Sequence, residues 1–101
     1  MNNQFSFLAE LEDIIQSRID NPADESYTSQ LVASGEKRVA QKIGEEAVEL
    51  ALASVAGSAQ EQLEEAADLV YHLLVLLRTK QLSLQDVSET LRLRHAARIA
   101  R

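Results

Sequence analysis

The chain has 101 residues, the size of one domain, and its three glycines and one proline are too few turn residues for many short strands. We therefore expect a single all-α domain over residues 1–101. A formal net charge of −6 argues against broad nucleic-acid binding, which needs a basic surface, and the absence of cysteine excludes disulfides and thiolate metal ligands.

The sequence carries no signal for export or for membrane insertion. The first residues lack the basic segment and long apolar run of a secretory signal. The longest apolar-rich run, residues 69–77, is too short to span a bilayer. We therefore expect a cytoplasmic protein that binds neither membranes nor nucleic acid.

Apolar residues at helical spacing predict a first amphipathic helix over residues 5–19. This helix should end near Asp20, because Pro22 disfavours helical backbone at the residue before it. A polar connection over residues 21–25 then leads to a short helical turn over residues 27–34. Gly35 suits the left-handed conformation in which many helices end.

Two long helices are predicted next, over residues 36–56 and 59–80, with a break at Gly57 and Ser58. Residues 69–77 are apolar nearly all the way round, which is typical of a helix buried on all sides. In so short a chain we expect a partner subunit to cover part of this run. Ser83 and Asp86 resemble a capping box that opens a last helix toward Ala97. The prediction is a bundle of four main helices, completed by dimerisation.

Each long helix carries a cluster of acidic residues among apolar ones. Residues three or four apart share a helix face, so Glu45 lies beside Glu49, and Glu65 beside Asp68. Like charges at this spacing destabilise an isolated helix by roughly 0.2–0.5 kcal/mol per pair. We therefore expect the two clusters to meet across the helix pair and to share a divalent cation. Oxygen ligands favour Mg²⁺ or Mn²⁺ over zinc.

One face of the first acidic helix changes from basic to acidic along its length. The residues on it are Arg38, Lys42, Glu45 and Glu49. This order suits a polyphosphate, whose oxygens would bind the cation while Arg38 and Lys42 meet the remaining charge. The alternative is a solvated face with Lys42 and Glu46 as an exposed ion pair. Burial of the acids among apolar residues would disfavour that alternative, because an unpaired buried carboxylate costs several kcal/mol. Periodicity alone leaves both interpretations open.

Histidine and tyrosine residues add weaker signals. His72 follows Asp68 by one helical turn, and we expect it to hydrogen-bond the Asp68 carboxylate and orient it. A core or interface role is the alternative for His72, and it is the expected one for Tyr71. His95 lies in a basic segment and is expected to have no role in the site. Tyr27 could stack on a ligand or hydrogen-bond to it, and simple packing explains it equally well.

Three stretches together resemble a known family. They are Ser-Tyr-Thr at residues 26–28, Lys-Ile-Gly-Glu-Glu-Ala-Val-Glu at 42–49, and Glu-Glu-Ala-Ala-Asp-Leu-Val-Tyr-His with its apolar continuation at 64–77. The acidic pattern resembles the all-α nucleoside triphosphate pyrophosphohydrolase (MazG-like) superfamily. With the other stretches it is most similar to phosphoribosyl-ATP pyrophosphohydrolase, over about residues 5–95.

This resemblance implies a reaction that composition cannot show. Phosphoribosyl-ATP would be hydrolysed between its α and β phosphates, giving phosphoribosyl-AMP and pyrophosphate, in the second step of histidine biosynthesis. The resemblance also implies an α-helical, Mg²⁺-dependent enzyme that forms a homodimer or a higher assembly. Family members are often fused to the cyclohydrolase of the next step. This chain has no room for that domain and no cysteine for its zinc, so we expect a monofunctional enzyme.

The family motif also implies site residues. The metal-binding acids would be Glu45, Glu46, Glu49, Glu65 and Asp68. Glu46 and Glu49 are the candidates for positioning or deprotonating the attacking water. Charge and placement add Lys37, Arg38 and Lys42 as phosphate contacts, with Tyr27 as a further substrate-binding residue.

Two alternatives remain open. One is a related pyrophosphohydrolase that clears non-canonical nucleoside triphosphates with the same metal site. The other is a non-enzymatic helical interaction module whose acids are solvated. Residues 26–28 and the Tyr71-His72 pair favour the histidine-pathway enzyme over the first alternative. The segment after His95 is short and lacks the acidic, lysine-rich ending of the family, so its role in closing the site is open.

Overall fold

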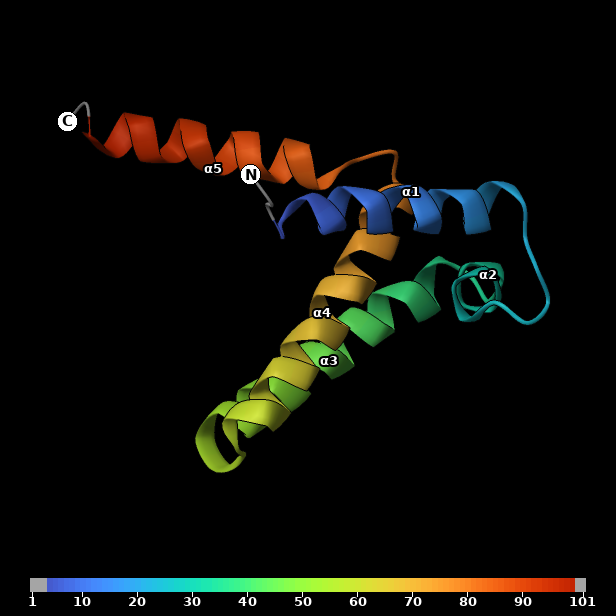
Figure 1. Cartoon of the computed structure of the whole chain (residues 1–101), viewed down its shortest axis with the longest axis horizontal. Coiled ribbons are helices and arrows are strands. Elements are labelled where there is room, and N and C mark those ends of the chain that lie inside the picture. The colour runs from blue at the N-terminus through green and yellow to red at the C-terminus, as the bar shows by residue number, and fades with distance from the viewer. Residues whose placement is uncertain (1–3, 100–101) are drawn as a thin grey trace.

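The computed structural model describes residues 4–99, which form five α-helices joined by short connections, with no strand among them. The helices are α1 (Ser6–Asp20), α2 (Tyr27–Ala33), α3 (Glu36–Ala56), α4 (Ala59–Thr79) and α5 (Leu84–Ile99) (Figure 1). The predicted all-α class is confirmed, with the short segment before the first long helix forming α2. None of these helices is long and apolar enough to cross a membrane.

The long helices α3 and α4 lie side by side as a hairpin, and the other helices gather at its open end (Figure 1). Helix α1 crosses the C-terminal part of α4, and α2 lies against the start of α3. Helix α5 extends away from this body. The turn of the hairpin, at Gly57 and Ser58, therefore projects from the rest of the molecule.

Serine capping boxes begin both α4 and α5. Ser58 accepts from the Glu61 amide at 3.1 Å, and the Glu61 carboxylate accepts from the Ser58 amide. Ser83 and Asp86 repeat this arrangement at 3.2 and 2.9 Å, so the predicted capping box is confirmed. Each box satisfies amide groups that have no partner within the helix.

Gly35 separates α2 from α3 with a φ of +106°. Side chains with a Cβ rarely adopt this backbone conformation, so glycine is required for the tight change of direction. The predicted end of the short helical segment at this glycine is confirmed.

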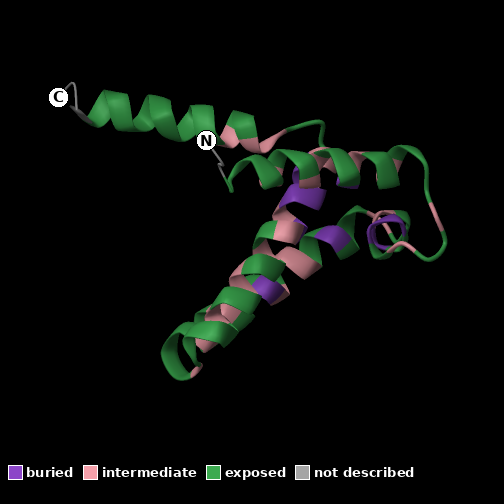
Figure 2. Ribbon diagram, viewed as in Figure 1, coloured by how far each residue is buried: buried purple, intermediate pink, exposed green. Residues whose placement is uncertain are grey.

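The core lies where four helices meet (Figure 2). Its buried members are Ile15 of α1, Leu31 of α2, Val39 of α3, and Leu74 and Val75 of α4. Most of the apolar run at residues 69–77 is covered within this chain, so the run does not by itself require the partner subunit that we expected. Large exposed apolar residues lie on the hairpin near its turn, at Val48, Leu52, Val55 and Leu63, and also in and around α1 and α5, among them Phe5, Phe7, Leu91 and Leu93.

Candidate metal and substrate site

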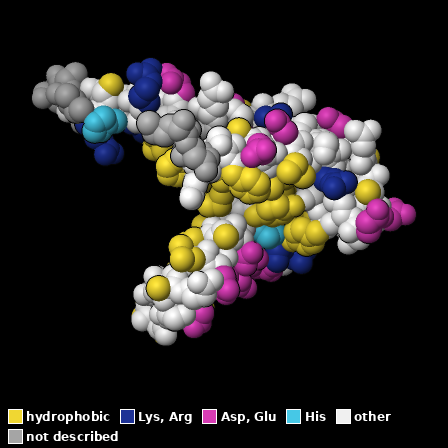
Figure 3. Space-filling view, in the orientation of Figure 1, with side chains coloured by type: hydrophobic (Ala, Val, Ile, Leu, Met, Phe, Trp, Pro, Cys, Tyr) yellow, Lys and Arg dark blue, Asp and Glu magenta, His cyan; other side chains and the backbone are white. Residues whose placement is uncertain are grey.

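Three acidic side chains meet between α3 and α4. Glu46 and Glu49 of α3 and Glu65 of α4 each offer a carboxylate oxygen, and the three oxygens lie within 4.8 Å of one another. Glu46 is buried, Glu65 half-buried and Glu49 exposed, so the cluster opens to solvent on one side. Acids cover one edge of the hairpin, beside basic side chains (Figure 3).

Two oxygens of this cluster lack partners. Glu46 Oε2 and Glu65 Oε2 are both buried and accept no hydrogen bond from the part of the chain that the structure describes. Buried polar atoms are nearly always paired, and an unpaired carboxylate oxygen is costly. Hard divalent cations bind carboxylate oxygens. The donor set therefore fits such a cation.

The neighbouring acids raise the pKa of the Glu49 carboxyl. The main cause is a hydrogen bond with Glu65, followed by the negative charge of Glu46. Carboxylates this close cannot all ionise freely, because each charge opposes the next. Without a cation, the Glu49 carboxyl therefore keeps its proton to a higher pH than an isolated glutamate would.

Basic side chains adjoin the cluster along α3. Lys42 Nζ lies 3.1 Å from Glu46 Oε1 and 3.9 Å from Glu45 Oε1, and Arg38 lies 3.6 Å from Glu45. The hydrogen bond with Glu46 raises the pKa of Lys42, which keeps the ammonium charged. The predicted change from basic to acidic along this face is thus present. The Lys42–Glu46 pair exists, but Glu46 is buried, which contradicts a fully solvated face.

The remaining predicted ligands lie outside the group of three. Glu45 turns toward Arg38 and Lys42. Asp68 is exposed on α4, three residues after Glu65. Lys37 is exposed in the first turn of α3. Their roles as metal ligands or phosphate contacts remain predictions.

The apolar stripe of α3 explains why Glu46, and not Glu45, faces inward. Every residue of the stripe is buried or half-buried, and the spacings are four, three, four and three: Val39, Ile43, Glu46, Leu50 and Ala53. An acid on the apolar stripe of a helix is the signal in the sequence that marks Glu46 as buried.

His72 does not contact the Asp68 carboxylate, as we expected it to. Its Nδ1 atom lies 2.7 Å from the main-chain carbonyl of Asp68, and its Nε2 atom lies 2.7 Å from the Tyr27 hydroxyl. The predicted hydrogen bond to the Asp68 carboxylate is therefore wrong, because the buried ring reaches the helix backbone one turn earlier. The Tyr27–His72 bond joins residues 45 positions apart, and no local pattern in the sequence could have predicted it.

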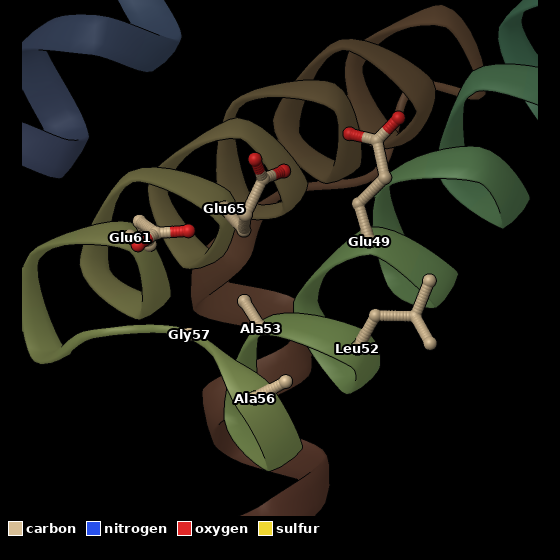
Figure 4. Close-up of a pocket in the computed structure, with 7 residues that line it drawn as sticks. All are labelled: Glu49, Leu52, Ala53, Ala56, Gly57, Glu61 and Glu65. Carbon is tan, nitrogen blue, oxygen red and sulfur yellow. The ribbon is translucent and has the colours of Figure 1, made fainter.

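A cleft of about 340 Å³ continues from the acids toward the hairpin turn. Its lining residues come from both helices and their turn (Figure 4): Glu49, Leu52, Ala53, Ala56, Gly57, Glu61 and Glu65. The cleft thus joins two acids of the cluster to an apolar wall of α3. Sequence patterns predicted the acids but not this wall.

Comparison with known proteins identifies the domain type. The sequence pattern of the family described as phosphoribosyl-ATP pyrophosphohydrolase matches residues 8–95. Three curated relatives are histidine biosynthesis bifunctional proteins HisIE. The match to the Photobacterium profundum protein is 49% identical over 89 residues, covering 88% of this chain and 43% of the relative. The Campylobacter jejuni protein is 50% identical over 96 residues, covering 95% and 46%. The Escherichia coli protein is 50% identical over 93 residues, covering 92% and 46%.

The chain therefore spans about half the length of the curated relatives it matches. The family pattern extends over most of the chain and includes both acidic clusters, the paired Tyr27 and His72, and the helices that carry them. The chain belongs to the phosphoribosyl-ATP pyrophosphohydrolase family.

Proposed function

We propose that this chain hydrolyses phosphoribosyl-ATP to phosphoribosyl-AMP and pyrophosphate, as the second step of histidine biosynthesis. The observation that carries the proposal is the meeting of three carboxylates, two of them with unpaired buried oxygens, beside a charged lysine. The family match supports this substrate, and the HisIE relatives, which are named as proteins of histidine biosynthesis, support the pathway.

Glu46, Glu49 and Glu65 would hold Mg²⁺, or Mn²⁺ in its place, with Glu45 and Asp68 as the further ligands implied by the family motif. When bound, the cation would neutralise charge on the phosphates and on the departing pyrophosphate. Two features of the cluster fit such a cation: all of its ligand atoms are carboxylate oxygens, and two buried oxygens have no other partner.

Basic and acidic side chains of the protein would have different roles in the reaction. Lys42 and Arg38, with Lys37 nearby, form a basic edge that would bind phosphate oxygens and orient the triphosphate. Glu49 is the exposed member of the cluster, so an oxygen of its carboxylate is placed to accept a hydrogen bond, and then a proton, from the attacking water. Glu46, held by Lys42, would fix the position of that water.

We also propose that the active protein is a cytoplasmic homodimer. The exposed apolar side chains near the hairpin turn, Val48, Leu52, Val55 and Leu63, favour coverage by a second copy. The cleft of about 340 Å³ is at the lower end of the usual size for ligand sites. A second copy would therefore supply further walls for a substrate as large as phosphoribosyl-ATP.

The test is pyrophosphate release from phosphoribosyl-ATP, with and without Mg²⁺, beside a panel of ordinary and modified nucleoside triphosphates. Fast Mg²⁺-dependent release from phosphoribosyl-ATP alone is the expected result. Release only from the triphosphate panel would retain the metal site and replace the function with nucleotide clearance. No release from any of them would leave the acidic cluster without an enzymatic role.

A further inference from the structure

We propose that Tyr27 binds the substrate as a hydrogen-bond acceptor, because His72 fixes the direction of its hydroxyl group. Its ligand would be a hydroxyl or amino group of the nucleoside part and not a phosphate oxygen. This inference rests on the proposed function and adds to it which part of the substrate Tyr27 contacts.

The first step is the direction of the Tyr27–His72 hydrogen bond. A carbonyl oxygen only accepts, so the 2.7 Å contact between His72 Nδ1 and the Asp68 carbonyl requires a hydrogen on Nδ1. In the neutral imidazole, Nε2 then carries a lone pair and only accepts. The Tyr27 hydroxyl, 2.7 Å away, must therefore donate its one hydrogen to His72.

The second step is that this arrangement is held in place. The His72 side chain is buried, with a relative exposure of 6%. The start of α2 is fixed by the buried Ser29, whose Oγ donates to the Arg18 carbonyl at 2.9 Å and accepts from the Ala23 amide at 3.1 Å. Tyr27 therefore has a fixed hydrogen-bond partner and a fixed backbone.

The third step is the position of Tyr27 relative to the site. Its side chain is 48% exposed, so a ligand can reach it. Its hydroxyl is bonded to His72, and His72 Nδ1 lies 2.7 Å from the main-chain carbonyl of Asp68, one of the acids that the family motif implies as metal ligands. Tyr27 thus lies beside the acidic residues of α4, and only the lone pairs of its hydroxyl oxygen remain for a ligand.

The chemistry of the substrate completes the argument. Ionised triphosphate oxygens are acceptors, and two acceptors do not form a hydrogen bond. Ribose hydroxyls and the adenine amino group are donors. Tyr27 therefore favours the nucleoside part of phosphoribosyl-ATP, while Lys42 and Arg38 favour the phosphates.

The experiment compares Tyr27→Phe with Thr28→Val as a matched control. Each substitution removes one hydrogen bond between α2 and α4, so the two should lower Tm by similar amounts. At pH 8 with Mg²⁺, Tyr27→Phe should raise KM for phosphoribosyl-ATP about 5- to 10-fold with kcat within about 2-fold, as expected for one lost hydrogen bond. Thr28→Val should leave both constants within about 2-fold. Equal changes in KM for the two variants would reduce Tyr27 to a structural role and overturn the inference.

Two binding probes, AMP and inorganic tripolyphosphate, separate this inference from the proposed function. By calorimetry with Mg²⁺, Tyr27→Phe should weaken AMP about 5- to 10-fold and leave tripolyphosphate unchanged. Equal weakening of both probes, no weakening of AMP, or no AMP binding by the unsubstituted protein would overturn the inference. If the protein fails to turn over phosphoribosyl-ATP but shows the selective AMP effect, the proposed function fails and the role of Tyr27 stands.

His72 is the positioning residue in this scheme, and two substitutions test it. His72→Leu removes the acceptor, so the Tyr27 hydroxyl keeps its lone pairs but loses its fixed direction and becomes free to donate. KM should therefore rise, though less than with Tyr27→Phe, and tripolyphosphate binding should not weaken. His72→Gln keeps an acceptor oxygen and should restore KM to within about 3-fold. The same KM for both variants would refute the positioning role.

Discussion

Helices α4 and α5 begin in the same way and then enter different surroundings. Both start with a serine capping box. Helix α4 buries four side chains, His72, Leu74, Val75 and Leu77, whereas none of the described side chains of α5 is buried (Figure 2). Local hydrogen bonds therefore decide where each helix starts, and the apolar pattern decides whether it joins the core.

The two halves of α4 show the same difference within one helix. Its second half carries the continuous apolar run and lies in the core, whereas its first half carries Glu61, Glu65 and Asp68 and is mostly exposed. The acidic site therefore lies outside the core, on a part of the hairpin where most side chains of α4 are exposed. Segments with few buried contacts are those that open most easily, which would help the entry of the proposed substrate.

Core substitutions should give the largest expected difference between α4 and α5. Leu74→Ala in α4 removes a fully buried side chain and should lower the free energy of unfolding by about 2–5 kcal/mol. Leu91→Ala in α5 removes a side chain that is 57% exposed and should change it by no more than about 0.5 kcal/mol. Urea unfolding measures both. A large loss for Leu91→Ala would mean that a second copy covers α5 in solution.

Acid substitutions should separate function from stability in α4. Glu65→Gln and Glu49→Gln should each lower pyrophosphate release at least about 100-fold, because each removes a charged oxygen donor from the cluster. Glu64→Gln is the matched control, since Glu64 is exposed on the same helix and accepts from Gln60. It should keep activity within about 2-fold. Activity retained by Glu65→Gln, with the helical circular dichroism intact, would remove the cluster from the reaction.

The fold could be predicted where it depends on local chemistry. Pro22, Gly35 and the pair at residues 57–58 ended helices where expected, because backbone restrictions act within one or two residues. The spacing of the acids also predicted that both long helices contribute to one site. The spacing did not predict how α3 is rotated about its axis. In the structure this rotation turns Glu46 into the cluster and Glu45 toward Arg38.

The rest of the site depends on contacts between residues distant in sequence. The Tyr27 hydroxyl meets His72 only because α2 lies against α4, and the Asp68 backbone is a better-placed partner for His72 than the Asp68 carboxylate. The apolar run at residues 69–77 predicted burial correctly, but α1, α2 and α3 of the same chain cover most of it. Helical periodicity predicts that a helix face is buried, but it does not predict which helix packs against that face.

The pH dependence of stability should report the acid cluster directly. The folded protein binds the Glu49 proton more tightly than the unfolded chain, since the pKa is raised above the ordinary value of 4.5. This stabilisation is complete below that value and is lost as pH rises through the raised pKa. Without metal, Tm should therefore fall more steeply with pH in the unsubstituted protein than in Glu49→Gln.

Binding of Mg²⁺ should restore the stability that the metal-free protein loses as the pH rises to neutral. A ligand at ten times its Kd stabilises the folded state by about 1.4 kcal/mol, so Tm should rise with Mg²⁺ in the unsubstituted protein. Glu49→Gln should show a smaller rise, because one oxygen ligand has lost its charge. Equal responses of the two proteins to both pH and Mg²⁺ would contradict the shared site.

Glycine substitutions around the connection between α4 and α5 should have the smallest effect on stability, and its sign should depend on the backbone conformation at each position. Gln81 follows α4 with a φ of +61°, and the Leu82 amide donates to the Leu77 carbonyl at 2.8 Å. Gln81→Gly should stabilise the protein by about 1 kcal/mol, because glycine adopts this left-handed conformation without strain. Gln85→Gly, four residues later in the first turn of α5, should destabilise it by about 0.5–1 kcal/mol, since glycine within a helix loses more backbone freedom. Thermal unfolding should therefore give shifts of opposite sign for the same substitution, and a shift of the same sign at both positions would contradict the left-handed end of α4.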